Sequence, residues 1–241
     1  MVRFAMLSRP GGRENNEDSI GMYNDEDEWC FALADGLGGH GKGEVASRLA
    51  VDTIVDQFVS GKREISFIDA AFEAAQDEIM TRQKEDRSCF DMKTTLVLLQ
   101  IGNERITWGH IGDSRLYYFK NSKIVRRTLD HSVPQMLVAV GEIKEKAIRH
   151  HPDQNRLLRV LGMEMDEIKY EVEEPVERQT NQQFLLCSDG FWELIEEKKM
   201  EATLRRAKDP QSWLDAMEKI VNKNGRGTDM DNYSAIAVWI E

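Results

Sequence analysis

The stretch Thr94–Thr128, TTLVLLQIGNERITWGHIGDSRLYYFKNSKIVRRT, decides the class of fold. It contains four short runs typical of β-strands: Thr94–Ile101, Arg105–Ile111, Arg115–Phe119 and Lys123–Thr128. Gly102-Asn103 and Asn121-Ser122 lie between runs, and such dipeptides are typical of hairpin turns. Hairpins in succession, with helical segments set apart from them, predict an antiparallel sheet core with helices packed outside.

The flanking sequence supplies those helices and more strands. Helices are predicted at Glu44–Val59, from Ser66 with Asp69 as its capping-box partner, and from Asp209-Pro210 to about Asn222. Further strands are predicted at Trp29–Ala34, Gln183–Ser188 and Tyr233–Ile240. Residues 132–162 are polar and irregular, which indicates short helices. Strict βαβ alternation is absent, so the predicted fold class is α+β rather than a doubly wound parallel fold.

Composition excludes several classes of protein. The 241 residues carry a net charge of −11, which argues against a non-specific grip on nucleic acid. No apolar run reaches the roughly 18 residues of a membrane span. The three cysteines are widely spaced, so neither a disulfide framework nor a zinc cluster is predicted, and the cytoplasm is the expected location. Without a linker or repeat, residues 1–241 are predicted to form a single domain.

Acidic residues stand at the ends of several predicted strands. Glu17 and Asp18 precede the run Ser19–Tyr23, and the others are Asp35, Asp189 and Asp231. A lone Asp-Gly pair usually marks a hairpin turn, but neither Asp35-Gly36 nor Asp189-Gly190 is followed by a pairing strand. Carboxylates at strand ends are partly desolvated and repel one another unless a cation neutralises them. The pattern therefore predicts a shared cation site.

The ligand types indicate which cation binds. Carboxylate oxygens without a His or Cys cluster favour Mg²⁺ or Mn²⁺ over zinc. Gly36 can add a backbone carbonyl, because it has no side chain to hinder the ion. Several carboxylates around one point can hold two ions, and a two-ion site activates water and clamps a phosphate for in-line attack.

Taken in order, five motifs resemble those of the metal-dependent type 2C protein serine/threonine phosphatases, and most closely the bacterial branch. They are Arg13-Glu14-Asn15-Asn16-Glu17-Asp18, Asp35-Gly36-Leu37-Gly38-Gly39-His40, Gly112-Asp113-Ser114-Arg115, Ser188-Asp189-Gly190 and Asp231-Asn232. Residues 132–162, together with Asp130-His131 before them, resemble the flap region of bacterial members.

The resemblance implies a four-layer αββα sandwich, two antiparallel sheets flanked by helices, with the metals at one end. The metal ligands it implies are Glu17, Asp18, Asp35, Gly36, Asp113, Asp189 and Asp231. Asp35 would bridge two ions, Asp189 and Asp231 would hold the second of them, and Asp113 would help hold a weaker third ion. Arg13 would bind the substrate phosphate, a role that suits its planar, permanently charged side chain.

The resemblance also implies the reaction. A hydroxide bridging two Mn²⁺ or Mg²⁺ ions would attack phosphoserine or phosphothreonine without a phosphoenzyme intermediate. Some family members have a histidine two residues after the first metal aspartate, but here that position is Leu37. The general acid is therefore His40 or a metal-bound water. The expected substrates are proteins phosphorylated by a partner Ser/Thr kinase, and the expected oligomeric state is a monomer.

Two other functions fit parts of the sequence. Residues Gly36–Gly43 match a nucleotide-binding P-loop at its first seven positions, but Gly43 occupies the eighth, where Ser or Thr should bind Mg²⁺. A non-catalytic phosphoprotein-binding module is the second alternative, which turnover of a phosphate ester would exclude.

His110 is interpreted as a core or edge histidine rather than a ligand.

Overall fold

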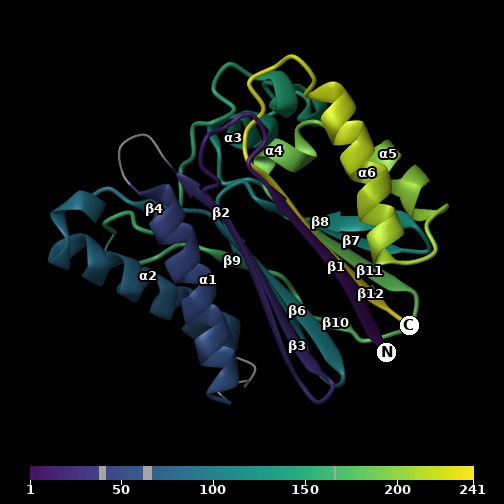
Figure 1. Cartoon of the computed structure of the whole chain (residues 1–241), viewed down its shortest axis with the longest axis horizontal. Helices are drawn as coiled ribbons and strands as arrows, with labels where there is room; N and C mark the ends of the chain where they lie inside the picture. The colour runs from purple at the N-terminus through teal and green to yellow at the C-terminus, as the bar shows by residue number, and fades with distance from the viewer. Residues whose placement is uncertain (38–41, 62–66, 166) are drawn as a thin grey trace.

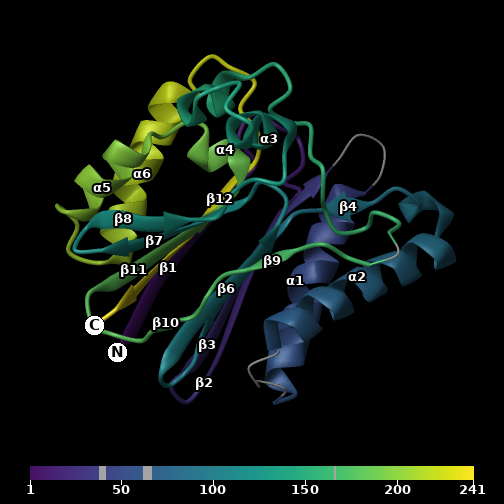
Figure 2. The same ribbon diagram turned by 180° about the vertical axis from the view of Figure 1, so that it is seen from behind.

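The computed structural model describes residues 1–37, 42–61, 67–165 and 167–241. Two β-sheets pack face to face, and helices cover the outer face of each sheet (Figures 1 and 2). The predicted α+β class and the four-layer sandwich are therefore confirmed. Every pair of strands in the described residues is antiparallel.

The first sheet brings the first and last strands of the chain together. Its order is β1 (Val2–Arg9), β12 (Tyr233–Ile240), β11 (Gln182–Cys187), β7 (Arg115–Lys120) and β8 (Lys123–Arg127). The second sheet has the order β10 (Val176–Glu177), β6 (Arg105–Ile111), β5 (Leu96–Ile101), β3 (Glu28–Leu37) and β2 (Asp18–Asp25). Two short strands extend it, β4 (Lys93–Thr94) beside β3 and β9 (Glu171–Val172) beside β6.

The helices fall into two groups. The long helices α1 (Gly43–Val59) and α2 (Phe67–Glu85) cover the second sheet. Helices α4 (Asp189–Trp192), α5 (Glu197–Leu204) and α6 (Pro210–Asn224) cover the first sheet. Residues 132–162 contain α3 (Val133–Ala139) and a 3₁₀ helix (Glu145–His150), and a second 3₁₀ turn spans Arg87–Cys89.

Alternation along each strand builds three cores. In β3, Phe31 and Leu33 face the core between the sheets, whereas Cys30, Ala32 and Ala34 face α1 and α2. Side chains on a strand point alternately to the two faces, so one apolar run serves two cores. The same division holds for β11 and β12 on the other sheet.

Local sequence signals explain several boundaries. Asn121 and Ser122 have φ values of 54° and 57°, the left-handed pair that a tight two-residue hairpin requires. Helix α6 begins after Asp209, whose side chain accepts the backbone N–H of Ser212. The Ser212 hydroxyl in turn accepts the backbone N–H of Asp209, which completes a capping box. The predicted start of α2 at Ser66 lies outside the described residues.

The structure departs from the sequence predictions in three places. Strand β3 continues through Asp35 to Leu37, so this acid lies within the strand and not after it. The predicted strand Thr94–Ile101 is divided at Thr95, whose groups hydrogen-bond Asp35. Strand β1 and helix α5 were not predicted, because each mixes charged side chains with few buried ones.

Two sequence predictions concern membrane spans and cysteines. None of the helices in residues 1–37, 42–61, 67–165 and 167–241 is both long and apolar enough to cross a membrane. All three cysteines are buried and free.

Candidate active site

A pocket of about 650 Å³ opens where both sheets end on the same side of the sandwich. The start of β2, the end of β3, the end of β11 and the start of β12 meet there. The pocket is lined by most of the predicted site residues: Arg13, Glu17, Asp35, Gly36, Asp113, Asp189 and Asp231. Asp18 lies directly behind them, opposite Asp35 in the β2–β3 register. His40 lies outside the described residues.

Asp18 joins the two sheets at the base of the pocket. Its Oδ2 accepts the Ser188 hydroxyl at 2.8 Å, and Ser188 itself holds the backbone N–H of Ser234 at 2.9 Å. Its other oxygen, Oδ1, is buried and accepts no hydrogen bond from any residue that the structure describes. A buried carboxylate oxygen without a donor is costly, and a bound cation would satisfy it.

The backbone around Asp35 is held rigidly. Its N–H donates to the Thr95 hydroxyl at 3.0 Å, and its carbonyl accepts the Thr95 N–H at 2.9 Å and the Thr94 hydroxyl at 2.9 Å. Next to it, a Cβ on Gly36 would lie 2.1 Å from the carbonyl oxygen of Gly43. Glycine is therefore required at position 36 for chain packing, a reason separate from the carbonyl ligand predicted from the sequence.

Asn232 is a site residue whose structural role was not predicted from the sequence. Its Oδ1 accepts the N–H of Glu17 at 2.8 Å, while its Nδ2 donates to the carbonyls of Pro10 and Asn15 at 2.9 and 2.8 Å. A side-chain amide can donate and accept at once, which fixes the loop carrying Arg13 against the start of β12. Its place beside Asp231 is the one sequence signal that could have revealed it.

Arg13 reaches the mouth of the pocket from this loop. Its Nε lies 3.2 Å from Oδ1 of Asp231, and its Nη2 donates to Oδ2 of the same carboxylate at 3.3 Å. Its Nη1 lies 3.4 Å from Asp229. The side chain remains 46% exposed, so its guanidinium faces the opening and not the core.

The acids raise one another's pKa values. Burial, and then the charges of Asp18, Asp189 and Asp113, hold the pKa of Asp35 well above its usual range. Burial likewise raises the pKa of Asp113 well above its usual range, that of Asp18 to about 7 and that of Asp189 to about 6. A divalent cation at their centre would remove this repulsion, so the residues fit a metal centre of oxygen ligands.

The sequence family model described as "Protein phosphatase 2C" matches residues 11–233. The chain belongs to the protein phosphatase 2C family. This membership confirms the resemblance found in the sequence motifs, and with it the predicted class of enzyme, a metal-dependent protein serine/threonine phosphatase. The parallel strand setting that a P-loop requires is absent from the described residues, since β3 pairs antiparallel with β2, β4 and β5.

Individual relatives give the extent of the likeness. The serine/threonine phosphatase stp of Listeria monocytogenes is 32% identical over 201 residues, which cover 80% of this chain and 79% of the relative. The serine/threonine protein phosphatase PstP of Mycobacterium tuberculosis is 29% identical over 98% of this chain, which spans 44% of that relative.

Solved structures agree. The crystal structure of the M. tuberculosis phosphatase PstP superposes with a TM-score of 0.87 at 28% identity, covering 100% of this chain and 99% of that one. The PstP catalytic domain in complex with two manganese ions gives a TM-score of 0.83 at 27% identity, with 100% and 99% coverage. The two manganese ions of this relative confirm the predicted pair of metal ions as the cofactor.

The pocket of this protein phosphatase 2C domain has further lining or neighbouring residues that the sequence motifs did not identify. Asn155 and Leu157, from residues 132–162, form part of its wall. Glu193 lies beside Asp189, and burial followed by the Asp189 charge raises its pKa to about 8. These positions belong to no recognisable strand-end pattern.

A buried ion pair between Arg115 and Asp130 lies next to the phosphatase pocket. Arg115 Nε and Nη2 donate to the two oxygens of Asp130 at 2.7 and 2.6 Å, and the guanidinium lies 3.4 Å from the ring centre of Trp192. The Trp192 indole N–H donates to the carbonyl of Asp113 at 3.0 Å. The pair therefore connects Asp113 to the segment that leads into residues 132–162.

Proposed function

We propose that this pocket removes phosphate from phosphoserine and phosphothreonine residues of proteins, with two Mn²⁺ or Mg²⁺ ions held by its carboxylates. The observation that carries the proposal is the convergence of buried acids on one pocket, with the unpaired Oδ1 of Asp18 at its base and Arg13 at its mouth. When bound, the ions activate water and neutralise the charge of the phosphate oxygens.

Asp35 is the central ligand in this proposal. Its carboxyl group is influenced by the charges of Asp18, Asp189 and Asp113 together, as a residue between two ions should be. The remaining proposed ligands are Glu17, Asp18, Gly36, Asp189 and Asp231, with Asp113 toward a weaker third ion. The pKa values of Glu17, Asp18, Asp113 and Asp189 are raised, as expected for acids whose ionised form a bound cation would stabilise.

Arg13 is proposed to hold the substrate phosphate. Asp231 engages two of the nitrogens of its guanidinium group and Asp229 lies 3.4 Å from the third, but the group has five N–H donors in all. The remaining donors at the pocket mouth suit two oxygens of a phosphate group. Arg13 would thus place the phosphorus atom beside the acids and orient it for attack.

Water is the proposed nucleophile, because the thiols are unsuited to the task. Burial raises the pKa of Cys30 and of Cys187, which keeps both protonated, and Cys89 is also buried. No phosphoenzyme should therefore form. His40, or a water near Asp113, is proposed to protonate the serine or threonine alkoxide as it leaves.

The surroundings of the pocket bear on its substrates. We take residues 1–241 as one phosphatase domain and residues 132–162 as its flap, because Asn155 and Leu157 bring this segment to the pocket wall. Phosphoproteins are the substrate class, and a partner Ser/Thr kinase is the proposed source of their phosphate. A monomer acting in the cytoplasm is the proposed form.

The test uses Asp35→Asn and the matched control Asp52→Asn, whose carboxylate is 67% exposed on α1. With a phosphothreonine peptide and saturating Mn²⁺, Asp35→Asn should lose at least about 100-fold in kcat, because the metals supply several kcal/mol of transition-state stabilisation. Asp52→Asn should keep the wild-type rate, and excess chelator should abolish wild-type turnover.

Unchanged kcat in Asp35→Asn, or undiminished turnover in chelator, would remove the two-ion proposal. A wild-type protein that binds phosphopeptide with Mn²⁺ but never releases inorganic phosphate would instead be a non-catalytic binding module. Tight binding of ATP by calorimetry would favour the P-loop alternative.

A further inference from the structure

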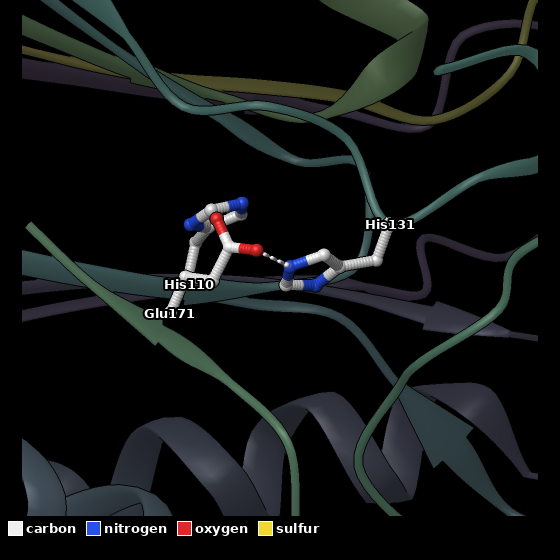
Figure 3. Close-up of side chains that lie close together, drawn as sticks. All are labelled: His110, His131 and Glu171. Atoms are coloured by element: carbon white, nitrogen blue, oxygen red, sulfur yellow. Dashed lines mark ion pairs between the residues drawn. The ribbon is translucent and has the colours of Figure 1, made fainter. Parts of the chain in front are cut away.

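A second cluster of possible metal ligands lies apart from the carboxylate pocket. His110 is the second-last residue of β6, and His131 follows β8. Glu171 begins β9, where it pairs with His110 in the strand register. Figure 3 shows the three side chains turned toward one another. One ligand atom from each lies within 4.8 Å of the other two.

His110 has the hydrogen bonding of a metal ligand. The side chain is fully buried, and its Nε2 lies 2.7 Å from the carbonyl oxygen of Leu129. A carbonyl only accepts, so the ring proton is on Nε2 and Nδ1 carries a free lone pair. That Nδ1 is buried and finds no hydrogen-bond partner in the described part of the chain. Ligating histidines commonly donate their second ring N–H to a backbone carbonyl in this way.

Glu171 and His131 complete the cluster on its solvent side. Nε2 of His131 lies 3.3 Å from Oε1 of Glu171, the contact dashed in Figure 3. The Glu171 side chain is 48% exposed, and Arg159 lies 3.7 Å from the same oxygen. Glu171 is therefore the solvent-exposed member of the cluster.

Both imidazoles are uncharged at neutral pH, and His110 already has a free lone pair on Nδ1. The pKa of each ring is lowered to about 4, mainly by burial and then by a neighbouring group, His131 in the case of His110 and Arg159 in the case of His131. A metal ion therefore does not have to displace a proton from either ring into solvent.

We propose that His110, His131 and Glu171 bind one divalent transition-metal ion, best matched by Zn²⁺, through Nδ1, Nε2 and a carboxylate oxygen. Two imidazoles and a carboxylate favour zinc over Mg²⁺ and Mn²⁺, and three protein ligands leave a fourth position for water. The site is separate from the phosphatase centre, and it does not depend on the proposed function.

Ligation requires two local adjustments. Around a tetrahedral ion with bonds of about 2.0–2.1 Å, ligand atoms lie about 3.3 Å apart. The exposed Glu171 side chain can move inward, and the two rings, stacked with centroids 4.6 Å apart, must tilt. Nδ1 of His131 also accepts the N–H of Gly112 at 3.2 Å, so its proton is on Nε2. Binding moves this proton to Nδ1 and breaks the bond from Gly112, the residue before Asp113.

The test is a Zn²⁺ titration of the ¹⁵N-labelled protein, saturated with Mg²⁺, followed by long-range ¹H–¹⁵N spectra of the histidine rings. The expected result is a joint shift of His110 Nδ1 and His131 Nε2 that saturates at one Zn²⁺ ion per chain. The Gly112 amide should shift over the same range. Mg²⁺ alone should leave both rings unchanged, because it prefers oxygen ligands.

Variants identify the carboxylate. Glu171→Gln should weaken the Zn²⁺ response at least about tenfold, as expected for loss of a ligand. Glu174→Gln, on the same exposed segment but outside the cluster, should titrate as the wild type does. Ring nitrogens that stay unshifted in excess Zn²⁺, or equal titrations for the two variants, would overturn the proposal. If zinc binds only at the acids of the phosphatase pocket, the ring nitrogens will stay unshifted, and the proposed phosphatase function will be unaffected by that result.

Discussion

Replacing Arg115 with methionine is expected to lower the free energy of unfolding by about 3 kcal/mol. Arg115 and Asp130 are 2% and 1% exposed, and removing one partner of a buried ion pair costs about 3–5 kcal/mol because the other charge remains buried. Arg127 still lies 3.5 Å from Asp130, which places the expected cost at the lower end of that range. Methionine retains an apolar contact with the Trp192 ring.

The assay is thermal unfolding of the chelated protein, which removes the contribution of metal binding to stability. For a chain of this length, roughly 2–4 °C are lost per kcal/mol, so the midpoint should fall by roughly 6–12 °C. The control is Arg3→Met, whose ion pair with Glu241 joins side chains 40% and 44% exposed and should contribute less than about 1 kcal/mol. Adding Asp130→Asn to Arg115→Met should restore part of the loss. Equal midpoints for the Arg115 and Arg3 variants would refute this account of the buried pair.

Three further predictions concern the pocket. Arg13→Ala should reduce kcat/KM for a phosphopeptide, and Arg13→Lys should recover only part of it, since lysine cannot bind phosphate in a bidentate way; identical kinetics for wild type and Arg13→Ala would place Arg13 outside the site. In chelator, the thermal unfolding midpoint should fall as pH rises from about 4 to about 7. The folded-state pKa values of Asp18 (about 7) and Asp189 (about 6) exceed the usual 3.8, so ionisation of these acids disfavours the folded state. Mn²⁺ should abolish that fall, and a flat profile in chelator would contradict the raised values. If His40 is the general acid, His40→Ala should slow a phosphoserine peptide far more than an aryl phosphate, typically by about 10²–10⁴-fold; equal slowing would exclude it.

The strand-end acids could be predicted because their signal is local. Each of Asp35, Asp189 and Asp231 stands beside an apolar run that is long enough to identify as a strand, and strand ends gather at the edges of sheets. The hairpins from Thr94 to Thr128 were predicted for the same reason. In both cases the residues that matter are neighbours in sequence.

The contacts that support the site could not be predicted, because their partners are distant in sequence. Asn232 bonds the loop at Pro10–Glu17, and Ser188 bonds Asp18, across gaps that no local pattern spans. His110 was interpreted as a core or edge histidine, which its burial bears out. Its approach to Glu171 depends on the pairing of β9 with β6, and β9 has only two residues.

The pairing of β1 with β12 has a consequence for the making of this protein. The two strands pair along their whole length, from Val2 opposite Ile240 to Arg9 opposite Tyr233, and Asp231 immediately precedes the later strand. During translation the acids of β2 and β3 emerge early, but β12 follows almost the entire chain. If Asp231 is a metal ligand as proposed, the metal centre can be completed only after β12 has been translated and has paired with β1.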